Sequence, residues 1–123
     1  MTYRLKVSEV STIRERQTVA QGGRCAICSL PLKRACLDHD HDTGAVRGTC
    51  CSGCNALLGK VENNYKRYGV QSIAAFCAGV AAYLNKHSVN ITGYLHPTYK
   101  TEDEKRVARN TRARKTRAAK KDT

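Results

Sequence analysis

The sequence predicts a small α+β fold, mostly α, that is held together by a bound metal ion and followed by a basic C-terminal tail. The chain has 123 residues, 41% of them apolar, with one Phe and no Trp, so it can bury only a thin core. Its seven cysteines include two Cys-x-x-Cys pairs, and a structural metal stabilises a domain whose core is thin. The net charge is +12, and it is concentrated near the C-terminus.

The composition excludes two classes of protein. No run approaches the roughly 18 consecutive apolar residues that a membrane-spanning helix needs, and residues 1–10 lack the apolar region of a secretory signal. We therefore expect a cytoplasmic protein without a membrane partner. Thiols stay reduced in that compartment, so an odd number of cysteines indicates metal binding and not a disulfide framework.

The chain divides into four expected segments. They are an N-terminal helical segment (1–24), a metal-bound segment of two strands and a helix (25–64), a core helix with its connection (65–97) and a basic, flexible tail (98–123). In the first segment, Thr12 and Glu15 have the spacing of a capping box, which predicts a short helix from about Thr12 to Gln21.

The second segment has the pattern of a hairpin followed by a helix. Residues 35–41 and 45–50 flank Asp42-Thr43-Gly44, a connection typical of a hairpin in which glycine supplies the positive φ. The stretch Ser52–Val61 then suits a helix with Ser52 as its N-cap. The predicted local order is strand, strand, helix.

A longer helix is predicted from Gly69 to about Lys86. Its apolar stripe consists of Val70, Ile73, Cys77, Val80, Ala81 and Leu84. We expect it to be the main core helix. Gly79 and nearby alanines leave a smooth face that suits either a homodimer contact or packing against the N-terminal helix, and the residues leave both possibilities open.

The tail is a separate electrostatic unit. Residues 100–123 carry a net charge of +6, as do the 99 residues before them, so the tail is about four times more charged per residue. Such an excess attracts a polyanion, usually nucleic acid. The tail is either a solvated segment or, as we favour, an arm that becomes ordered on the phosphate backbone. The residues expected to contact DNA are Arg47, Lys105, Arg106, Arg109, Arg112, Arg114, Lys115 and Arg117.

The two cysteine pairs predict a structural zinc site. Cys25 and Cys28 are separated by 22 residues from Cys51 and Cys54. Paired spacing of this kind brings four thiolates around one tetrahedral zinc ion, which leaves no open position for water. Cys50 could also reach a metal, but we favour Cys51 because only Cys51 repeats the two-residue gap of the first pair.

Between the pairs lies an acidic and histidine cluster, Asp38-His39-Asp40-His41. A carboxylate suits Mg²⁺, and an imidazole can take a proton from water, so the cluster predicts hydrolysis of a phosphodiester. Side chains alternate along a strand, so a shared site needs a bulge, a twist or a strand end. Asn55 follows Cys54 and offers an amide oxygen as a second ligand, or else it orients a neighbour. A polar strand end without chemistry is the alternative for the cluster.

Together these motifs resemble the phage recombination endonuclease VII family. They are Cys25-x-x-Cys28, Leu37-Asp38-His39-Asp40-His41, Thr43-Gly44, Val46-Arg47-Gly48, Cys51-x-x-Cys54-Asn55 and Gly59. The resemblance covers about Thr12 to Gly59 and extends more weakly to His96-Pro97. It implies a zinc-stapled ββα-metal element of the His-Me finger (HNH-like) nucleases. The family has Leu-like residues where this chain has Thr49-Cys50, which predicts a change in strand packing.

The resemblance also implies residue roles and an activity. Asp38 and Asn55 would hold a catalytic magnesium ion, His39 would be the general base and His41 would assist at the phosphate, whereas Asp40 receives no role. The implied activity is a magnesium-dependent, phage-encoded DNA endonuclease of the host cytoplasm that cuts branched DNA or Holliday junctions. A homing-type or nicking endonuclease on duplex DNA is the first alternative. A non-catalytic zinc-finger DNA-binding protein is the second, although such a module needs no carboxylate facing the phosphates.

Overall fold

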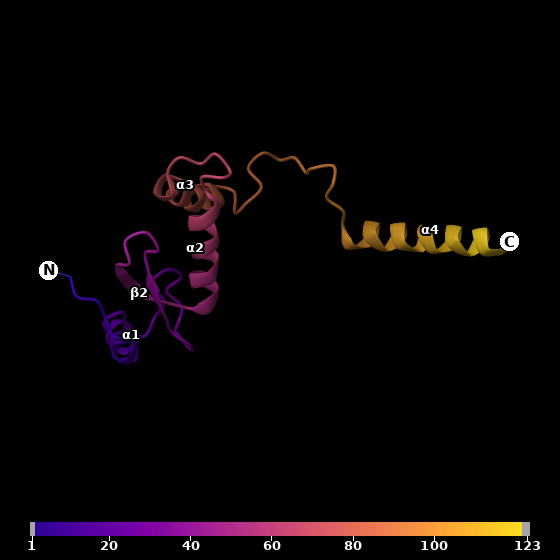
Figure 1. The fold of residues 1–123 in the computed structure, drawn as a ribbon. Helices are drawn as coiled ribbons and strands as arrows, with labels where there is room; N and C mark the ends of the chain where they lie inside the picture. The colour runs from indigo at the N-terminus through magenta and orange to yellow at the C-terminus, as the bar shows by residue number, and fades with distance from the viewer. Residues whose placement is uncertain (1, 122–123) are drawn as a thin grey trace. The chain divides into compact units, whose positions relative to one another are not determined.

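The structure, a computed structural model, describes residues 2–121. In chain order it contains a 3-10 helix η1 (Val7–Glu9), α1 (Val10–Ala20), β1 (Cys36–His39), β2 (Val46–Cys50), α2 (Ser52–Asn64), α3 (Ile73–Lys86) and α4 (Glu102–Lys121) (Figure 1). The predicted small α+β class is confirmed. The chain separates into two compact units, one ending at Val80 and one beginning at Ala81. Within the described residues, every helix is too short or too polar to cross a lipid bilayer.

The two strands form an antiparallel hairpin with one irregularity. Leu37 pairs with Thr49, but His39 pairs with Val46, so the two residues 47 and 48 of β2 lie opposite Asp38 alone. This is a β-bulge, which bends a strand and redirects its side chains. For Asp38 and the histidines to share one site, the strand must be distorted. The structure shows that distortion as a bulge at Asp38.

The hairpin turn begins earlier than the sequence predicts. The predicted first strand ended at residue 41, but β1 ends at His39 because Asp40 starts the turn. The amide of Asp40 donates to the carbonyl of Ala45 at 2.8 Å, and the amide of Gly44 donates to the carbonyl of Asp40 at 2.7 Å. Gly44 has φ +77°, the positive value predicted for it.

The N-terminal helix exists, but α1 begins two residues before the predicted start at Thr12 and follows directly on η1. The carboxylate of Glu9 accepts hydrogen bonds from the Lys6 amide at 2.8 Å and the Tyr3 hydroxyl at 3.0 Å. These contacts organise η1, and α1 follows from Val10. The predicted capping box at Thr12 is therefore wrong, because the start of the helix is already fixed upstream.

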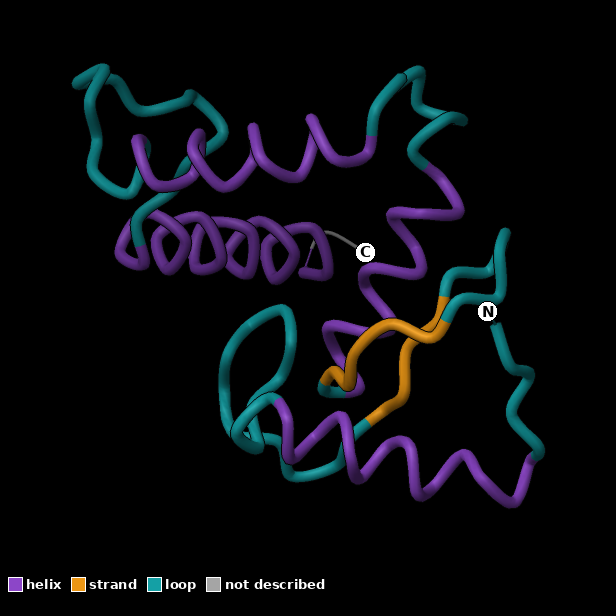
Figure 2. The backbone as a smooth tube through the Cα atoms, turned by 90° about the vertical axis from the view of Figure 1, so that its left-hand side faces the viewer, coloured by secondary structure: helices purple, strands orange, loops and turns teal. Residues whose placement is uncertain are grey.

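Polar contacts join α1 to the hairpin, on which it packs (Figures 1 and 2). The Thr18 hydroxyl donates to that of Thr49 at 3.2 Å. The Gln21 side chain donates to the carbonyl of Thr49 at 2.9 Å and accepts from its amide at 2.8 Å. Thr49 has no exposed surface, so its contacts with Thr18 and Gln21 are buried polar contacts between β2 and the C-terminal end of α1.

Helix α2 follows the hairpin directly and packs on both strands. Its N-cap is Cys51 and not the predicted Ser52, because the Cys51 sulfur accepts a hydrogen bond from the Cys54 amide at 3.4 Å. The helix continues to Asn64, three residues beyond the predicted end. Cys51 and Cys54 therefore form both the N-terminal cap of α2 and the second cysteine pair.

Helix α3 is shorter and more exposed than expected. It begins at Ile73, where the Ser72 hydroxyl accepts from the Ala75 amide at 3.2 Å. None of its residues is buried, and Phe76 is 44% exposed. The prediction of a main core helix is wrong, because helical periodicity identifies an apolar face but not what covers it. Since α1 packs on the hairpin, the homodimer contact is the alternative that stays a prediction.

The core lies where the hairpin meets the cysteine pairs. Among the described residues, those classed as buried are Cys25, Asp38, Thr49 and Cys50. No large aliphatic or aromatic side chain is among them. The domain therefore depends on polar and sulfur contacts more than a typical hydrophobic core does.

The basic segment is helical, which corrects the expectation of a tail without regular structure. The amide of Glu104 donates to the Thr101 hydroxyl at 3.1 Å and caps the helix. Acidic residues occupy the first turn of α4 and lysines the last, which suits the helix dipole. Alanine, arginine and lysine also favour helix between these ends. A run of basic charge therefore does not by itself indicate irregular structure.

We expect Gly48→Ala to destabilise the domain, because a Cβ at this position lies 2.8 Å from Oε1 of Gln21 and 3.1 Å from Cβ of Ala26. The free energy of unfolding should fall by about 1–3 kcal/mol in a denaturant titration. Gly53→Ala adds the same methyl group where nothing lies within 4 Å, so its stability should not fall. Equal behaviour of the two variants would contradict the contact between α1 and the hairpin.

Candidate metal centre and active site

Four cysteine side chains converge on one point. The sulfur atoms of Cys25, Cys28, Cys51 and Cys54 all lie within 4.8 Å of one another. In a tetrahedral site with Zn–S bonds of about 2.3 Å, the sulfur atoms lie roughly 3.8 Å apart. The cluster is therefore compatible with a structural zinc ion. Both Cys-x-x-Cys pairs contribute to it.

Backbone amides favour the thiolate form of Cys25. The sulfur of Cys25 accepts from the amides of Ile27 at 3.4 Å and Cys51 at 3.3 Å. Burial alone would raise the pKa of Cys25, but backbone hydrogen bonds from Cys28, Cys51 and Ile27 outweigh it and lower this pKa to about 6. A thiolate at neutral pH is the form that binds zinc.

The remaining cysteines lie outside the cluster. Cys50 is buried on β2, and desolvation is the main reason that its pKa rises to about 11, so it stays a neutral thiol. Cys36 is half-buried on β1, and Cys77 is exposed on α3. The described residues do not bury Cys77, so the packing role expected for it is not found among them.

The carboxylate of Asp38 is held by an arginine. Arg47 donates from Nε to Oδ2 at 2.7 Å and from Nη2 to Oδ1 at 3.2 Å. The other edge of the guanidinium donates to both carboxylate oxygens of Glu62 on α2, each at 3.0 Å. The hydrogen bonds that Arg47 donates to Glu62, and then those to Asp38, raise its pKa further, so the guanidinium remains charged. Arg47, expected to contact DNA, is thus engaged by two carboxylates.

The two histidines of the motif lie together. The rings of His39 and His41 stack with centroids 4.7 Å apart and planes 14° from parallel, and both residues are exposed. The carboxylate of Asp40 accepts from the amides of Asp42 at 2.8 Å and Thr43 at 3.1 Å. These two amides are also the main cause of the lowered pKa of Asp40. Asp40 therefore shapes the turn that brings the rings together.

Asn55 lies in the first turn of α2, directly after Cys54. Its backbone amide donates to the carbonyl of Cys51 at 3.0 Å, which ties it to the cysteine cluster. Within the described residues, its half-buried side chain forms no hydrogen bond and does not contact Asp38 in that way. Its carboxamide oxygen is therefore not used by the protein.

A cavity of about 200 Å³ separates the hairpin turn from α2. Its walls include Asp40, His41 and Asp42 of the turn and Gly59, Glu62 and Asn63 of α2. Water has a volume of about 30 Å³ in the liquid, so the cavity can hold several molecules. The cavity gives solvent access to His41 and to the Glu62 side of the arginine cluster.

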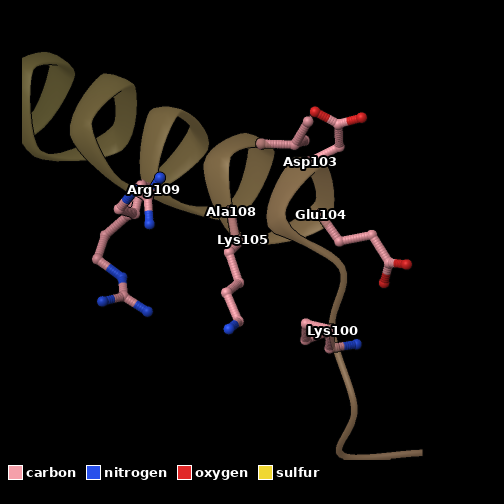
Figure 3. Close-up of a pocket in the computed structure, with 8 residues that line it drawn as sticks. Lys100, Asp103, Glu104, Lys105, Ala108 and Arg109 are labelled. Atoms are coloured by element: carbon pink, nitrogen blue, oxygen red, sulfur yellow. The ribbon is translucent and has the colours of Figure 1, made fainter.

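Helix α4 presents a strongly basic and exposed surface. Lys105 and Arg109 extend from the same side of the helix, around a shallow depression (Figure 3). In the first turns, Lys105 pairs with Glu102 at 3.2 Å and Arg106 with Asp103 at 3.1 Å. Exposed pairs of this kind contribute little energy and can be exchanged for phosphate contacts. The other residues of this helix that are expected to contact DNA come after these first turns: Arg109, Arg112, Arg114, Lys115 and Arg117.

Two residues of the site have no motif that would identify them. Gln21 binds the backbone of β2, and Glu62 binds Arg47. Glu62 lies seven residues after Asn55, which is two turns along the same helix face. That spacing is the sequence signal that could have found Glu62, whereas nothing local points to Gln21.

Comparison with known proteins gives one family and two phage relatives. The profile of a family described as Recombination endonuclease VII matches residues 2–86, and thus ends at the last residue of α3. The Gene 59 protein of Mycobacterium phage D29 is 46% identical over 60 residues, which are 46% of this chain and 34% of the relative. The Gene 59 protein of Mycobacterium phage L5 is 55% identical over 38 residues, which are 28% of this chain and 23% of the relative. The matches thus cover about a third or less of these relatives.

We expect purified protein to contain one zinc ion per chain and Cys51→Ser to lose it, because Cys51 supplies both a sulfur to the cluster and the cap of α2. Zinc content by elemental analysis and helix content by circular dichroism are the measurements. Cys50→Ser, the same change one residue earlier, should keep the zinc. Cys77→Ser on the exposed face of α3 is the neutral control. Zinc retained by Cys51→Ser but lost by Cys50→Ser would reverse the assignment.

Proposed function

Because the chain belongs to the recombination endonuclease VII family, we propose that it is a metal-dependent DNA endonuclease that hydrolyses phosphodiester bonds in branched DNA such as Holliday junctions. Residues 25–64 form its zinc-bound catalytic segment, of the His-Me finger (HNH) type. The proposal places its action in DNA recombination in the host cytoplasm, as the phage relatives suggest.

One observation carries this proposal: a nearly buried carboxylate lies in the strand that leads to two stacked, exposed histidines. Asp38 is 9% exposed, and its oxygens retain lone pairs beyond those that Arg47 uses. The backbone amide of Asn55 donates to the carbonyl of Cys51 in the cysteine cluster, and its carboxamide oxygen forms no hydrogen bond within the described residues. Hard oxygen donors of this kind suit Mg²⁺. Asp38 and Asn55 are therefore the proposed magnesium ligands, and the four cysteines of the cluster are the proposed zinc ligands.

The proposed chemistry assigns a separate task to each residue. The ring nitrogens of His39 form no hydrogen bond within the described residues, so the exposed imidazole is free to take a proton from the attacking water. His41, stacked on it, interacts with the phosphate. Asp40 holds the turn and keeps the two rings together. A bound Mg²⁺ supplies charge stabilisation at the phosphate and the leaving oxygen.

Substrate binding is assigned to the basic helix and to the shape of the assembled enzyme. Helix α4 supplies phosphate contacts without base specificity. The exposed apolar residues of α3, such as Phe76 and Leu84, are the proposed homodimer contact, and a dimer would place two catalytic sites on one branched molecule.

A nicking or homing-type endonuclease on duplex DNA is the nearest alternative. It uses the same catalytic residues and differs only in substrate. A non-catalytic DNA-binding protein is a different class. Two features favour catalysis over DNA binding alone: the Asn55 carboxamide that forms no hydrogen bond within the described residues, and the solvent-accessible pair His39 and His41. A protein that only binds DNA needs neither.

We expect His39→Ala to reduce cleavage by about 10²–10⁴-fold, because it removes the general base without touching zinc or α4. The rates are measured with Mg²⁺ on equal amounts of junction, nicked, linear and single-stranded DNA. DNA binding and zinc content should stay at the wild-type level. His87→Ala, which removes an exposed imidazole after the end of α3, should cleave normally.

The same panel separates the alternatives. Fastest cleavage of the junction supports the proposed substrate, and fastest cleavage of linear duplex supports the homing-type or nicking enzyme. Near-normal rates in His39→Ala would overturn the assigned base. Wild-type protein that binds all four forms and cuts none would be a binding module.

Deletion of residues 101–123 is expected to weaken binding to every DNA form and to make the affinity less dependent on salt. Each neutralised phosphate contact releases roughly 0.9 counterion, so loss of α4 lowers the slope of log K against log salt. Fluorescence anisotropy at several salt concentrations measures both effects. Cleavage at saturating protein should survive. An unchanged slope would show that α4 does not contact DNA, and lost cleavage at saturation would assign it to the active site.

A further inference from the structure

We propose that Glu62 is a positioning residue that keeps the Asp38 site negatively charged, so that a divalent cation can bind while Arg47 orients the carboxylate. The inference rests on the proposed function. Its basis is the cluster of three charged side chains, Asp38, Arg47 and Glu62, which we call the carboxylate–arginine triad. No motif in the sequence connects Glu62 to Asp38, which lies 24 residues earlier.

The backbone explains why Arg47 reaches Asp38. Arg47 lies in the bulge of β2 opposite Asp38. It donates to both oxygens of this carboxylate, at 2.7 and 3.2 Å, which fixes the carboxylate plane. A third contact at 3.4 Å reaches the carbonyl of His39. Arg47 therefore orients both the proposed ligand and the backbone of the proposed base.

Charge balance explains why Glu62 is needed. Asp38 and Arg47 alone form a neutral pair, and a neutral pair attracts a divalent cation weakly. Glu62 binds the opposite edge of the guanidinium through two bonds of 3.0 Å and returns the triad to a net charge of −1. The orienting effect of Arg47 is kept, and the attraction for a cation is restored.

The exposure of the three side chains agrees with this assignment. Asp38 has 11% of its side chain exposed, whereas Arg47 and Glu62 have 33% and 30%. Arg47 and Glu62 are thus reached by solvent, and Glu62 also lines the cavity beside His41. A residue that served only to close the core would not need this access.

The test is a charge series measured on the full-length, zinc-loaded protein. The net charge of the triad is −1 in the wild type, 0 in Glu62→Gln, −2 in Arg47→Gln and again −1 in the double variant. The dissociation constant for Mn²⁺, measured by electron paramagnetic resonance without DNA, should rise about tenfold in Glu62→Gln, since a unit charge acts over several ångströms in a largely solvated site. Arg47→Gln should bind Mn²⁺ more tightly than wild type, and the double variant should match the wild type.

A second readout separates charge from orientation. Arg47→Gln should have a lower kcat for cleavage in spite of its tighter cation binding, because Asp38 is no longer fixed. Glu15→Gln removes the same charge from the exposed side of α1 and should change neither quantity. Zinc content and thermal stability, measured on each variant, establish that it is folded, and Gln is accepted within helix α2.

Each outcome decides the inference. Wild-type Mn²⁺ affinity in Glu62→Gln would overturn it while leaving the proposed endonuclease intact. Weaker Mn²⁺ binding in the double variant than in Glu62→Gln would also overturn it. If the two residues acted only on structure, their effects would add, whereas opposite changes of charge cancel. Wild-type protein that binds no Mn²⁺ would overturn the proposed magnesium site and this inference with it.

Discussion

The convergence of four thiols on one point is the constraint on which the rest of the domain depends. The buried residues of the described chain are few, and none is a large apolar side chain. The cluster joins the loop before the hairpin to the first turn of α2, and it uses Cys51 both as a ligand candidate and as a helix cap. Because Asn55 is the next residue after Cys54, the same constraint fixes where the proposed catalytic helix begins relative to the hairpin.

The sequence predicts the local structure of this domain better than it predicts the long-range contacts. The two Cys-x-x-Cys pairs, the glycine in the hairpin turn and the order strand, strand, helix follow from spacing and turn chemistry, which act over a few residues. The alternation of side chains along a strand also indicates a bulge, a twist or a strand end near the Asp38 cluster, and the structure has the bulge. The cysteine cluster, which contains Cys51 and not Cys50, follows from one repeated gap.

The features that could not be predicted from the sequence depend on tertiary contacts or on partners outside the described chain. The bond between Arg47 and Glu62 spans 15 residues and requires both the bulge and the packing of α2 on the strands. Gln21 recognises backbone atoms, so its role leaves no pattern in the sequence. Helix α3 has the periodicity of a core helix, but none of its residues is buried by the described part of the chain. Helix α4 is stabilised by its cap and by the charges at its ends, which the run of basic residues does not reveal.

The polar contact between α1 and the hairpin has a thermodynamic consequence. Gln21, Thr18 and Thr49 use hydrogen bonds where most small domains bury aliphatic surface. The heat capacity change of unfolding comes mainly from exposing apolar surface, and averages about 12–15 cal/mol/K per residue in globular proteins. A domain that buries so little apolar surface has a smaller value and therefore a flatter stability curve. With the proposed zinc ion in the cysteine cluster, removal of metal would lower the folded population more than a moderate change in growth temperature would.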